Sequence, residues 1–445
     1  MQHEPISTVA PRTCRPQRLR RGSAPGVCLG LLLVARLAVA ADWPCLRGPA
    51  GNDTTSEASG WPMPNWPGDP VWTQEVGEGA TSPIVAGGRL YVMGWQAGKD
   101  SVYALDAATG TEIWRQSYPC PEYTRFHSGD EGWYHGVSST PAYDAATGLL
   151  FSLSTDGDLC CWDAKAGGKS VWHMNLHDTY SVPARPAVGG GHADHGYTTS
   201  PLVFGKVLLV EVGAPEGNLM AFDKRTGARL WVSQCKDATG QTGGVTPITI
   251  RGIPCVAVFT ISNLVVVRTD RGHEGETLAS YHFETQNGQN TVTPAVAGDK
   301  VLLSSGLDME KTVCLQVGLG GIVKLWEGKA TTRVCCPIVI RGRVFMVYEA
   351  LKCVDFATGA TKWTAGTFGE DASLLLTGDD KLIVFGKRKL ALVDVAGTSA
   401  DAYHQLALRA NVASAHSWPH VTLAAGRLYA KDDNGKLLCF MVGKH

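Results

Sequence analysis

Short apolar stretches alternate with polar, glycine-containing turns along most of this chain. Three segments, at residues 102–114, 219–231 and 351–363, share one pattern: an apolar stretch ends at an aspartate, a turn closes with Thr-Gly, and a second stretch carries a tryptophan. In each segment the glycine follows the aspartate by four residues, and the tryptophan follows the glycine by four. Such a unit cannot bury its apolar face alone, so its recurrence predicts neighbouring copies that pack against one another.

The aspartate, glycine and tryptophan positions of this repeat have structural roles. An aspartate accepts hydrogen bonds from the amides of a turn, a glycine permits positive φ, and a tryptophan can pack on the next unit. We therefore interpret the repeat residues as structural. They are Asp106, Gly110, Trp114, Asp163, Trp172, Asp223, Gly227, Trp231, Trp326, Asp355, Gly359, Trp363 and, in an N-terminal strand, Trp72.

A second pattern precedes each copy and sets the number of units. A Ser/Thr-Pro step, altered to Cys336-Pro337 in one copy, is followed by a glycine-containing turn and an apolar strand, so the unit has four strands. The last unit, at 420–441, supplies three strands, and an unpaired strand at about 71–76 can complete it. The sequence predicts an all-β fold: an eight-bladed β-propeller of four-stranded antiparallel blades over 71–445, closed by that pairing, after an N-terminal extended segment at 41–70.

The first 40 residues have the pattern of an export signal. Five arginines between Arg12 and Arg21 precede a short apolar run at 27–35, and Ala38-Val39-Ala40 resembles a cleavage site. The apolar run is too short to cross a bilayer. We expect a signal peptide at 1–40 and a location in the periplasm or outside the cell, without a transmembrane anchor.

Charge and cysteine content exclude some classes of function. Without the six arginines and one glutamate of 1–40, the chain has 34 basic and 40 acidic side chains, a net charge of about −6, which argues against a nucleic-acid partner. Eleven cysteines remain, with vicinal pairs at Cys160-Cys161 and Cys335-Cys336 but no Cys-x-x-Cys motif. We favour buried thiols that act as small apolar groups.

The repeat Ala/Val-x-Asp-x-x-Thr-Gly-x-x-x-Trp resembles the pyrroloquinoline-quinone-like (PQQ-like) repeat of bacterial eight-bladed propellers. The resemblance covers about residues 43–445, and the opening Trp43-Pro44-Cys45-Leu46-Arg47-Gly48-Pro49 is similar to the start of exported PQQ-like propellers of unassigned role. The family includes quinoprotein alcohol dehydrogenases and the scaffold lipoprotein of the outer-membrane assembly machine. The resemblance implies the fold, but it does not choose between enzyme and scaffold.

The quinoprotein dehydrogenases imply a specific cofactor site. In that family calcium, acidic and amide ligands, an arginine, a tryptophan floor and a vicinal disulfide accompany the quinone. In this sequence neither cysteine pair lies in a long loop, and the haem-attachment motif Cys-x-x-Cys-His is absent. We expect no cofactor, with PQQ and calcium as the alternative.

Two long connections, at 117–138 and 173–198, hold six of the thirteen histidines. Because they are equivalent connections of neighbouring blades, we expect them on one face. His135 and His195 each precede the proline of a Ser/Thr-Pro step by six residues, so both are expected at the mouth of the central channel. His416, Trp418 and His420 could face the same funnel.

Three interpretations of the loop histidines stay open. His135, His195 and His192 with Asp194 offer donors suited to zinc or copper. The same groups could serve as general acids or bases, or each histidine could cap a loop by bonding to backbone.

The predicted function is a monomeric binding or scaffold module that binds a protein partner or small ligand on this face. Arg125, Trp133, Tyr134 and Tyr180 are residue types that anchor interfaces. The alternatives are a PQQ-dependent oxidoreductase of alcohols or sugars, and a propeller hydrolase or lyase that uses the loop histidines.

Overall fold

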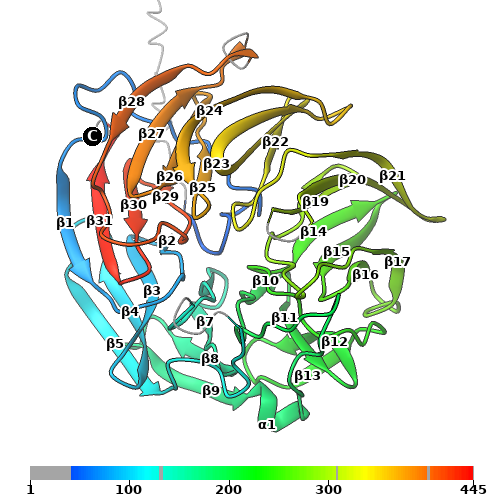
Figure 1. Ribbon diagram of the computed structural model, residues 1–445. Helices are drawn as coiled ribbons and strands as arrows, with labels where there is room; N and C mark the ends of the chain where they lie inside the picture. The colour runs from blue at the N-terminus through cyan, green and yellow to red at the C-terminus, as the bar shows by residue number, and fades with distance from the viewer. Residues whose placement is uncertain (1–41, 130–133, 307–308, 398–400, 444–445) are drawn as a thin grey trace, which may run out of the picture. The chain divides into compact units, whose positions relative to one another are not determined.

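The computed structural model describes residues 42–129, 134–306, 309–397 and 401–443 (Figure 1). The described residues form eight antiparallel sheets arranged as the blades of a propeller, with one five-residue helix, α1 (Leu176–Tyr180). The all-β, eight-bladed prediction is confirmed. The signal peptide predicted at 1–40 lies outside the described residues.

Seven sheets are runs of consecutive strands, and the eighth combines the two ends of the propeller. The first four comprise β2 (Ile84–Ala86), β3 (Arg89–Gln96), β4 (Lys99–Asp106) and β5 (Glu112–Pro119); β6 (Ala142–Asp144), β7 (Leu149–Leu153), β8 (Asp158–Asp163) and β9 (Lys169–Asn175); β10 (Leu202–Phe204), β11 (Val207–Ala214), β12 (Gly217–Asp223) and β13 (Arg229–Val232); and β14 (Thr246–Ile250), β15 (Ile253–Phe259), β16 (Asn263–Arg268) and β17 (Thr277–His282). The next three comprise β18 (Ala295–Ala297), β19 (Lys300–Ser305), β20 (Lys311–Gly318) and β21 (Gly321–Gly328); β22 (Ile338–Ile340), β23 (Arg343–Asp355) and β24 (Thr361–Gly369); and β25 (Ser373–Leu376), β26 (Lys381–Gly386), β27 (Lys389–Asp394) and β28 (Gln405–Arg409). The eighth comprises β1 (Pro70–Glu75), β31 (Lys436–Met441), β30 (Arg427–Lys431) and β29 (Thr422–Ala424).

Burial follows the position of each strand in its sheet. A middle strand such as β7 is buried along its whole length because sheets cover both of its faces, so it reads as a nearly continuous apolar run. The outer strand β1 alternates half-buried and exposed residues. The first strands of neighbouring sheets contact one another, β2 with β29 and β6 with β10 for example, so they surround the propeller axis.

One sheet departs from the expected four strands. In the sheet β22–β23–β24, the strand β23 runs through what the other sheets divide into two strands. Its first part pairs with β22 at Val344 and Phe345, and its second part pairs with β24 from Leu351 onward. Glu349, between these parts, has a φ of 60°, so the chain turns there and the sheet keeps the shape of the others.

The predicted closure is present. β1 pairs antiparallel with β31, with Trp72 opposite Cys439 and Thr73 opposite Leu438. The Trp72 ring lies 5.9 Å from that of Tyr429 on β30. Pairing the two ends removes the open sheet edges that an unclosed ring would present to other chains.

The repeat tryptophans connect neighbouring blades. The indole nitrogens of Trp72, Trp114, Trp172 and Trp326 each donate to the carbonyl that follows the turn aspartate of the next blade. The turn glycine of that blade lies under the indole: a Cβ on Gly110, Gly168, Gly227 or Gly359 would come within 2.5–2.9 Å of the ring. In the second blade this position belongs to Gly168, not Gly167, because one inserted residue shifts the turn. The other two repeat tryptophans, Trp231 and Trp363, pack in clusters with residues of the next sheet.

Replacing Gly359 by alanine should test this arrangement. Gly359 has a φ of 75° and its added Cβ would lie 2.6 Å from the Trp326 ring. We expect the left-handed backbone to cost about 1–2 kcal/mol and the overpacking to add about 1–3 kcal/mol. Gly298→Ala is the matched control, since Gly298 has a φ of 64° with nothing within 4 Å. Equal losses of unfolding free energy in urea for both variants would show that the indole contact is unimportant.

The N-terminal segment at 42–69 crosses one end of the axis. It bonds through its main chain to the first strands of three sheets, β2, β6 and β25. The bonds are Trp43 N to Val85 O, 2.7 Å, Tyr143 N to Pro44 O, 2.8 Å, and Thr55 N to Leu376 O, 2.9 Å. The Arg47 guanidinium adds bonds to the carbonyls of Pro294 and Pro337, ahead of β18 and β22. With the bonds of Ala425 and Gly426 in the last blade to the Glu57 carboxylate, the segment holds six blades together at this end.

Candidate functional site: an axial pocket

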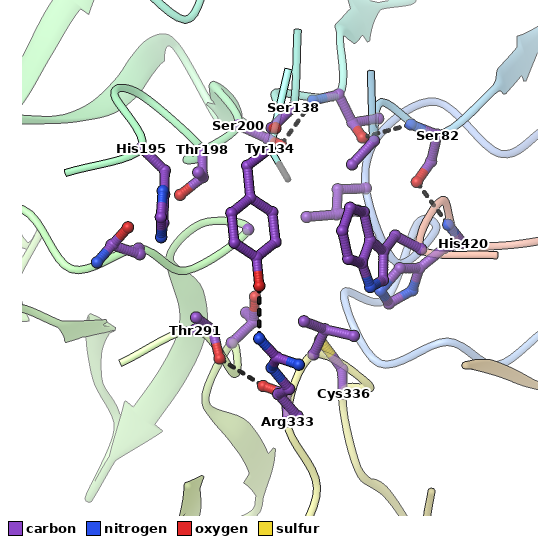
Figure 2. A pocket seen from close by; sticks show the side chains of 18 of the residues that line it. Ser82, Tyr134, Ser138, His195, Thr198, Ser200, Thr291, Arg333, Cys336 and His420 are labelled. Carbon is purple, nitrogen blue, oxygen red and sulfur yellow. Dashed lines mark hydrogen bonds between the residues drawn. The ribbon is translucent and has the colours of Figure 1, made fainter. Parts of the chain in front are cut away.

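A pocket with a cavity volume of about 130 Å³ lies on the axis (Figure 2). Its walls come from residues just ahead of the first strands in seven of the eight sheets of the described chain. These residues are Ser82, Thr140, Ser200, Gly243, Thr293, Cys336 and His420. Because seven blades contribute residues from this region, the pocket is a product of the ring and is absent from any single blade.

Aromatic side chains form one wall. The ring of Tyr134 stacks on that of Trp418, with centroids 5.0 Å apart, and lies 4.4 Å from the imidazole of His195. Arg333 donates to the Tyr134 hydroxyl at 2.5 Å across the pocket (Figure 2). Arg333 also pairs with Glu370. The two long connections thus contribute Tyr134 and His195, while Trp418 and Arg333 come from later blades.

Three buried polar atoms in the pocket wall have no hydrogen-bond partner among the described residues. They are His195 Nδ1, Gln241 Oε1 and Thr293 Oγ1, on side chains that are 7%, 4% and 2% exposed. Burial, together with the positive charges of Arg185 and His127, lowers the pKa of His195 to about 4, so its imidazole is neutral at pH 7. Since buried polar groups in proteins are almost always paired, these three atoms are the natural contacts for a ligand.

The two long connections lie against each other, as expected for neighbouring blades. The main chains of Ser128 and Asp194 bond to each other in both directions. The connections are shorter at their start than predicted from the sequence, because β5 continues to Pro119 and β9 to Asn175. His173 therefore lies on a strand rather than in a loop.

The four residues predicted to bind metal occupy different environments. His192 bonds Ser128 Oγ through Nδ1 and the Arg185 carbonyl through Nε2, both at 2.8 Å. Asp194 is buried against the Arg185 guanidinium. His135 lies 3.5 Å from Glu78 and does not line the pocket, whereas His195 does. In the described part of the chain, no three His, Cys, Asp or Glu side chains are grouped to hold a metal ion.

The predicted partner-binding residues are also separated. Arg125 makes ion pairs with Asp156 and Asp178 at 2.8 and 2.6 Å. Tyr180 packs on Phe222, 6.1 Å between rings, at the edge of the third sheet. Tyr134 is in the axial pocket, and Trp133 lies outside the described residues.

A buried ionic network borders the pocket on the side of the N-terminal segment. Arg47 Nε donates to Asp53 Oδ2 at 2.6 Å, and His420 Nδ1 bonds Asp53 Oδ1 at 2.9 Å. The Arg47 and Asp53 side chains are 3% and 1% exposed. Burial alone would raise the pKa of Asp53, but the charges of Arg47 and His420 and their hydrogen bonds hold it below its ordinary value.

Sequence reasoning missed several residues of the pocket, among them Arg333, Gln241, Gln289 and Cys336. One of them carried a signal: Cys336 occupies the position of the Ser/Thr-Pro step, where other blades carry the hydroxyls of Ser82, Thr140, Ser200 and Thr293. Arg333, Gln241 and Gln289 occupy no position of the repeat pattern, so the sequence did not point to them.

The pocket does not match the donor set of a calcium-bound quinone. An arginine and a tryptophan line it, but among the described residues its wall contains neither aspartate nor glutamate. Calcium in proteins takes six to eight oxygen ligands, usually with carboxylates among them. The residues present therefore do not fit the calcium–PQQ pair, and we derive no reaction step through it.

Comparison with known proteins places the chain in a family. A family model described as "Outer membrane protein assembly factor BamB" matches residues 65–123 and 98–365, more than half of the chain. The chain belongs to this family of PQQ-like propellers. Within the described residues, no helix is both long and apolar enough to cross a bilayer.

Individual relatives divide between two kinds of protein. BamB of Burkholderia pseudomallei is 26% identical over 222 residues, covering 48% of this chain and 44% of the relative. The quinohemoprotein alcohol dehydrogenase of Comamonas testosteroni is 30% identical over 154 residues, covering 34% of this chain and 19% of the relative. The chain thus spans less than half the length of either of these curated relatives.

Solved structures show the same division. BamB of Moraxella catarrhalis superposes with a TM-score of 0.57 at 12% identity, covering 84% of this chain and 99% of the other. The Comamonas testosteroni dehydrogenase gives 0.61 at 15% identity, covering 91% and 81%. These likenesses establish the fold, which scaffolds and enzymes share.

Proposed function

We propose that this propeller is a binding module of the bacterial cell envelope that holds a neutral polar group in its axial pocket. The observation that carries the proposal is the set of three buried, unpartnered polar atoms described above for the pocket wall. A relative named as an outer membrane protein assembly factor supports the envelope location.

The chemistry of the wall favours a ligand with hydroxyl or amide groups. Serine, threonine and glutamine side chains line the pocket, the imidazole of His195 is neutral, and the charge of Arg333 is already balanced by Glu370. Hydroxyl and amide groups both donate and accept, so they can satisfy a mixed set of buried donors and acceptors. The stacked pair Tyr134–Trp418 offers an apolar surface to the rest of the ligand.

The neutral group can come from a free small molecule or from a side chain of a docked protein partner. A scaffold would present the pocket to such a side chain as an anchor point at the centre of an interface. Calorimetric titration distinguishes the two sources: N-acetylglucosamine is the free probe, and a short unstructured peptide with a central asparagine is the probe for a partner.

Replacing Gln241 by leucine should weaken binding of whichever probe binds. The buried Gln241 amide would no longer pair with the ligand, and we expect about a tenfold rise in Kd, equivalent to about 1.4 kcal/mol. Tyr180→Phe, which changes a tyrosine away from the pocket, is the control and should leave Kd unchanged. Equal affinity of Gln241→Leu and the wild type would contradict the proposal.

The alternative function, a quinoprotein oxidoreductase, predicts a different experimental result. Addition of PQQ and calcium to the purified protein would shift the absorbance of the quinone and allow dye-linked alcohol oxidation. If both signals appeared and neither neutral probe bound, the protein would be an oxidoreductase and the proposed binding function would be wrong.

A further inference from the structure

Cys336, His420 and Asp53 form a chain of three interacting side chains beside the axial pocket. His420 Nδ1 bonds Asp53 Oδ1 at 2.9 Å, and His420 and Cys336 line the same pocket and interact electrostatically. Since Nδ1 is engaged by the carboxylate, Nε2 is the nitrogen without a carboxylate partner. The three residues come from the N-terminal segment and from two different blades, so only the closed ring assembles them.

Neighbouring bonds fix the orientation of each member. The Asp53 carboxylate accepts Arg47 Nε at 2.6 Å on its second oxygen, and the main-chain nitrogen of His420 donates to Ser82 Oγ at 2.8 Å. A carboxylate on one imidazole nitrogen sets the tautomer and leaves the other nitrogen to exchange a proton with a nucleophile. This is the order of parts found in thiol and hydroxyl nucleophile triads.

The thiol faces a space that can hold a substrate. Cys336 and His420 both line the axial pocket (Figure 2). His195, Gln241 and Thr293, each with an unpartnered buried polar atom, line the same pocket. Cys336 is 3% exposed, so the pocket is the approach to its sulfur. The charged or titratable groups that act on it are Arg47, His420 and Asp53, with Cys335 next to it in the chain.

Electrostatics favour the reactive form of the sulfur. Burial raises the pKa of the Cys336 thiol, but the positive charge of Arg47 and the interactions with His420 bring it below its ordinary value of 9.0. Burial alone would lower the pKa of His420, but the charge and hydrogen bond of Asp53 raise it above its ordinary value, to about 10. A thiolate paired with an imidazolium is the ground state of an activated cysteine.

We propose that Cys336 is a catalytic nucleophile that accepts an acyl group from a small ester bound in the axial pocket, with His420 as its acid–base partner and Asp53 as a positioning residue. This activity is separate from the binding of neutral ligands and does not depend on it. Cys335, by contrast, is fully buried and burial raises the pKa of its thiol, so it takes no part.

The reaction balances with water as the only co-reactant. The Cys336 thiolate attacks the ester carbonyl carbon, an S–C bond forms, and the carbonyl electron pair moves to oxygen. When the pair returns, the C–O bond breaks and the leaving alkoxide takes the proton of the His420 imidazolium. Neutral His420 then accepts a proton from water as water attacks the thioester; the S–C bond breaks, and the thiolate and a carboxylic acid are released.

Cysteine-resolved alkylation of the wild-type full chain tests the nucleophile without any substitution. Iodoacetamide should label Cys336 at pH 6 at least about tenfold faster than Cys235, because thiolate is the reacting species. Cys235 is an internal control: it is more exposed than Cys336, but burial raises its pKa to about 12. Labelling of Cys336 no faster than Cys235 at pH 6 would overturn the proposal.

Acyl transfer is tested with p-nitrophenyl acetate. We expect a burst of one p-nitrophenolate per chain and an acetyl group on Cys336, both retained in Cys335→Ser and both lost in Cys336→Ser. Asp53→Asn should slow acylation by about a hundredfold or more and move the alkylation pH profile of Cys336 to higher pH, which a merely structural role would not do. An acetyl group found on lysine or on another cysteine, or a burst that survives in Cys336→Ser, would contradict the assignment.

Discussion

Replacement of Arg47 by alanine is expected to destabilise the propeller by about 3–5 kcal/mol. Its guanidinium neutralises the buried carboxylate of Asp53 and bonds the carbonyls of Pro294 and Pro337. Without it, Asp53 is left with only His420 as a cationic neighbour, and two buried carbonyls lose a donor. The expected result is a lower urea midpoint in equilibrium unfolding, with the slope of the transition unchanged.

The control for this substitution is an arginine in an exposed ion pair. Arg341→Ala removes a pair with Asp380 in which the arginine side chain is 59% exposed, and it should leave the midpoint where it is. Combining Arg47→Ala with Asp53→Asn should cost less than the sum of the two single changes, because the pair then leaves no unbalanced charge. Two results would show that the pair does not hold the segment to the ring. One is a double variant whose loss of unfolding free energy equals the sum of the two single losses, and the other is an Arg47→Ala protein as stable as the wild type.

Acidification is expected to destabilise the protein through His195 by about 3 kcal/mol between pH 6.5 and pH 4. The pKa of His195 in the folded protein is about 4, lowered by burial and by nearby positive charge from its ordinary value of 6.5. Above pH 6.5 the imidazole is neutral in both states, so it has no effect. As the pH falls from 6.5 towards 4, the unfolded chain binds the proton first, and the free energy of unfolding decreases.

A variant isolates this contribution from the other groups that titrate in acid. His195→Gln cannot take up the proton, so its unfolding free energy should fall less than that of the wild type over the same pH range. His282→Gln changes an exposed histidine, 68% exposed, and should retain the full acid dependence. Parallel pH curves for the wild type and His195→Gln would mean that His195 is not protonated on unfolding.

The resemblance to scaffolds and dehydrogenases identifies the fold, whereas the candidate site indicates which ligands should be tested. The family shares the ring of blades, whereas the ligand chemistry depends on the side chains that line the axial pocket. In the part of the chain that the structure describes, the pocket wall has hydroxyl, amide, imidazole and thiol groups and no carboxylate. That composition is the reason to test neutral ligands and acyl transfer in this protein, alongside quinone-dependent oxidation.

The architecture could be predicted because each blade is formed by residues that lie close together along the chain. The Asp-Thr-Gly turn and the following tryptophan repeat at fixed spacing, and the unpaired strand near Trp72 has an obvious partner in the incomplete last blade. Local hydrogen bonds and side-chain periodicity are properties of neighbouring residues, so a sequence displays them directly. Of the three residues expected at the channel from their position ahead of an innermost strand, Trp418 and His420 line the pocket. His416 does not line it and bonds Asp433 at 2.9 Å.

The sequence alone therefore determined the blade, the number of blades and the way the ring closes, whereas the tertiary structure decided which side chains meet on the axis. Loop residues such as His135 and His195 occupy equivalent positions, yet only His195 reaches the pocket. Asp53 and His420 are separated by 367 residues and bond at 2.9 Å, and no spacing rule links them. The physical reason is that a closed ring brings the starts of all its sheets to one point, where contacts depend on loop paths and packing that no local pattern encodes.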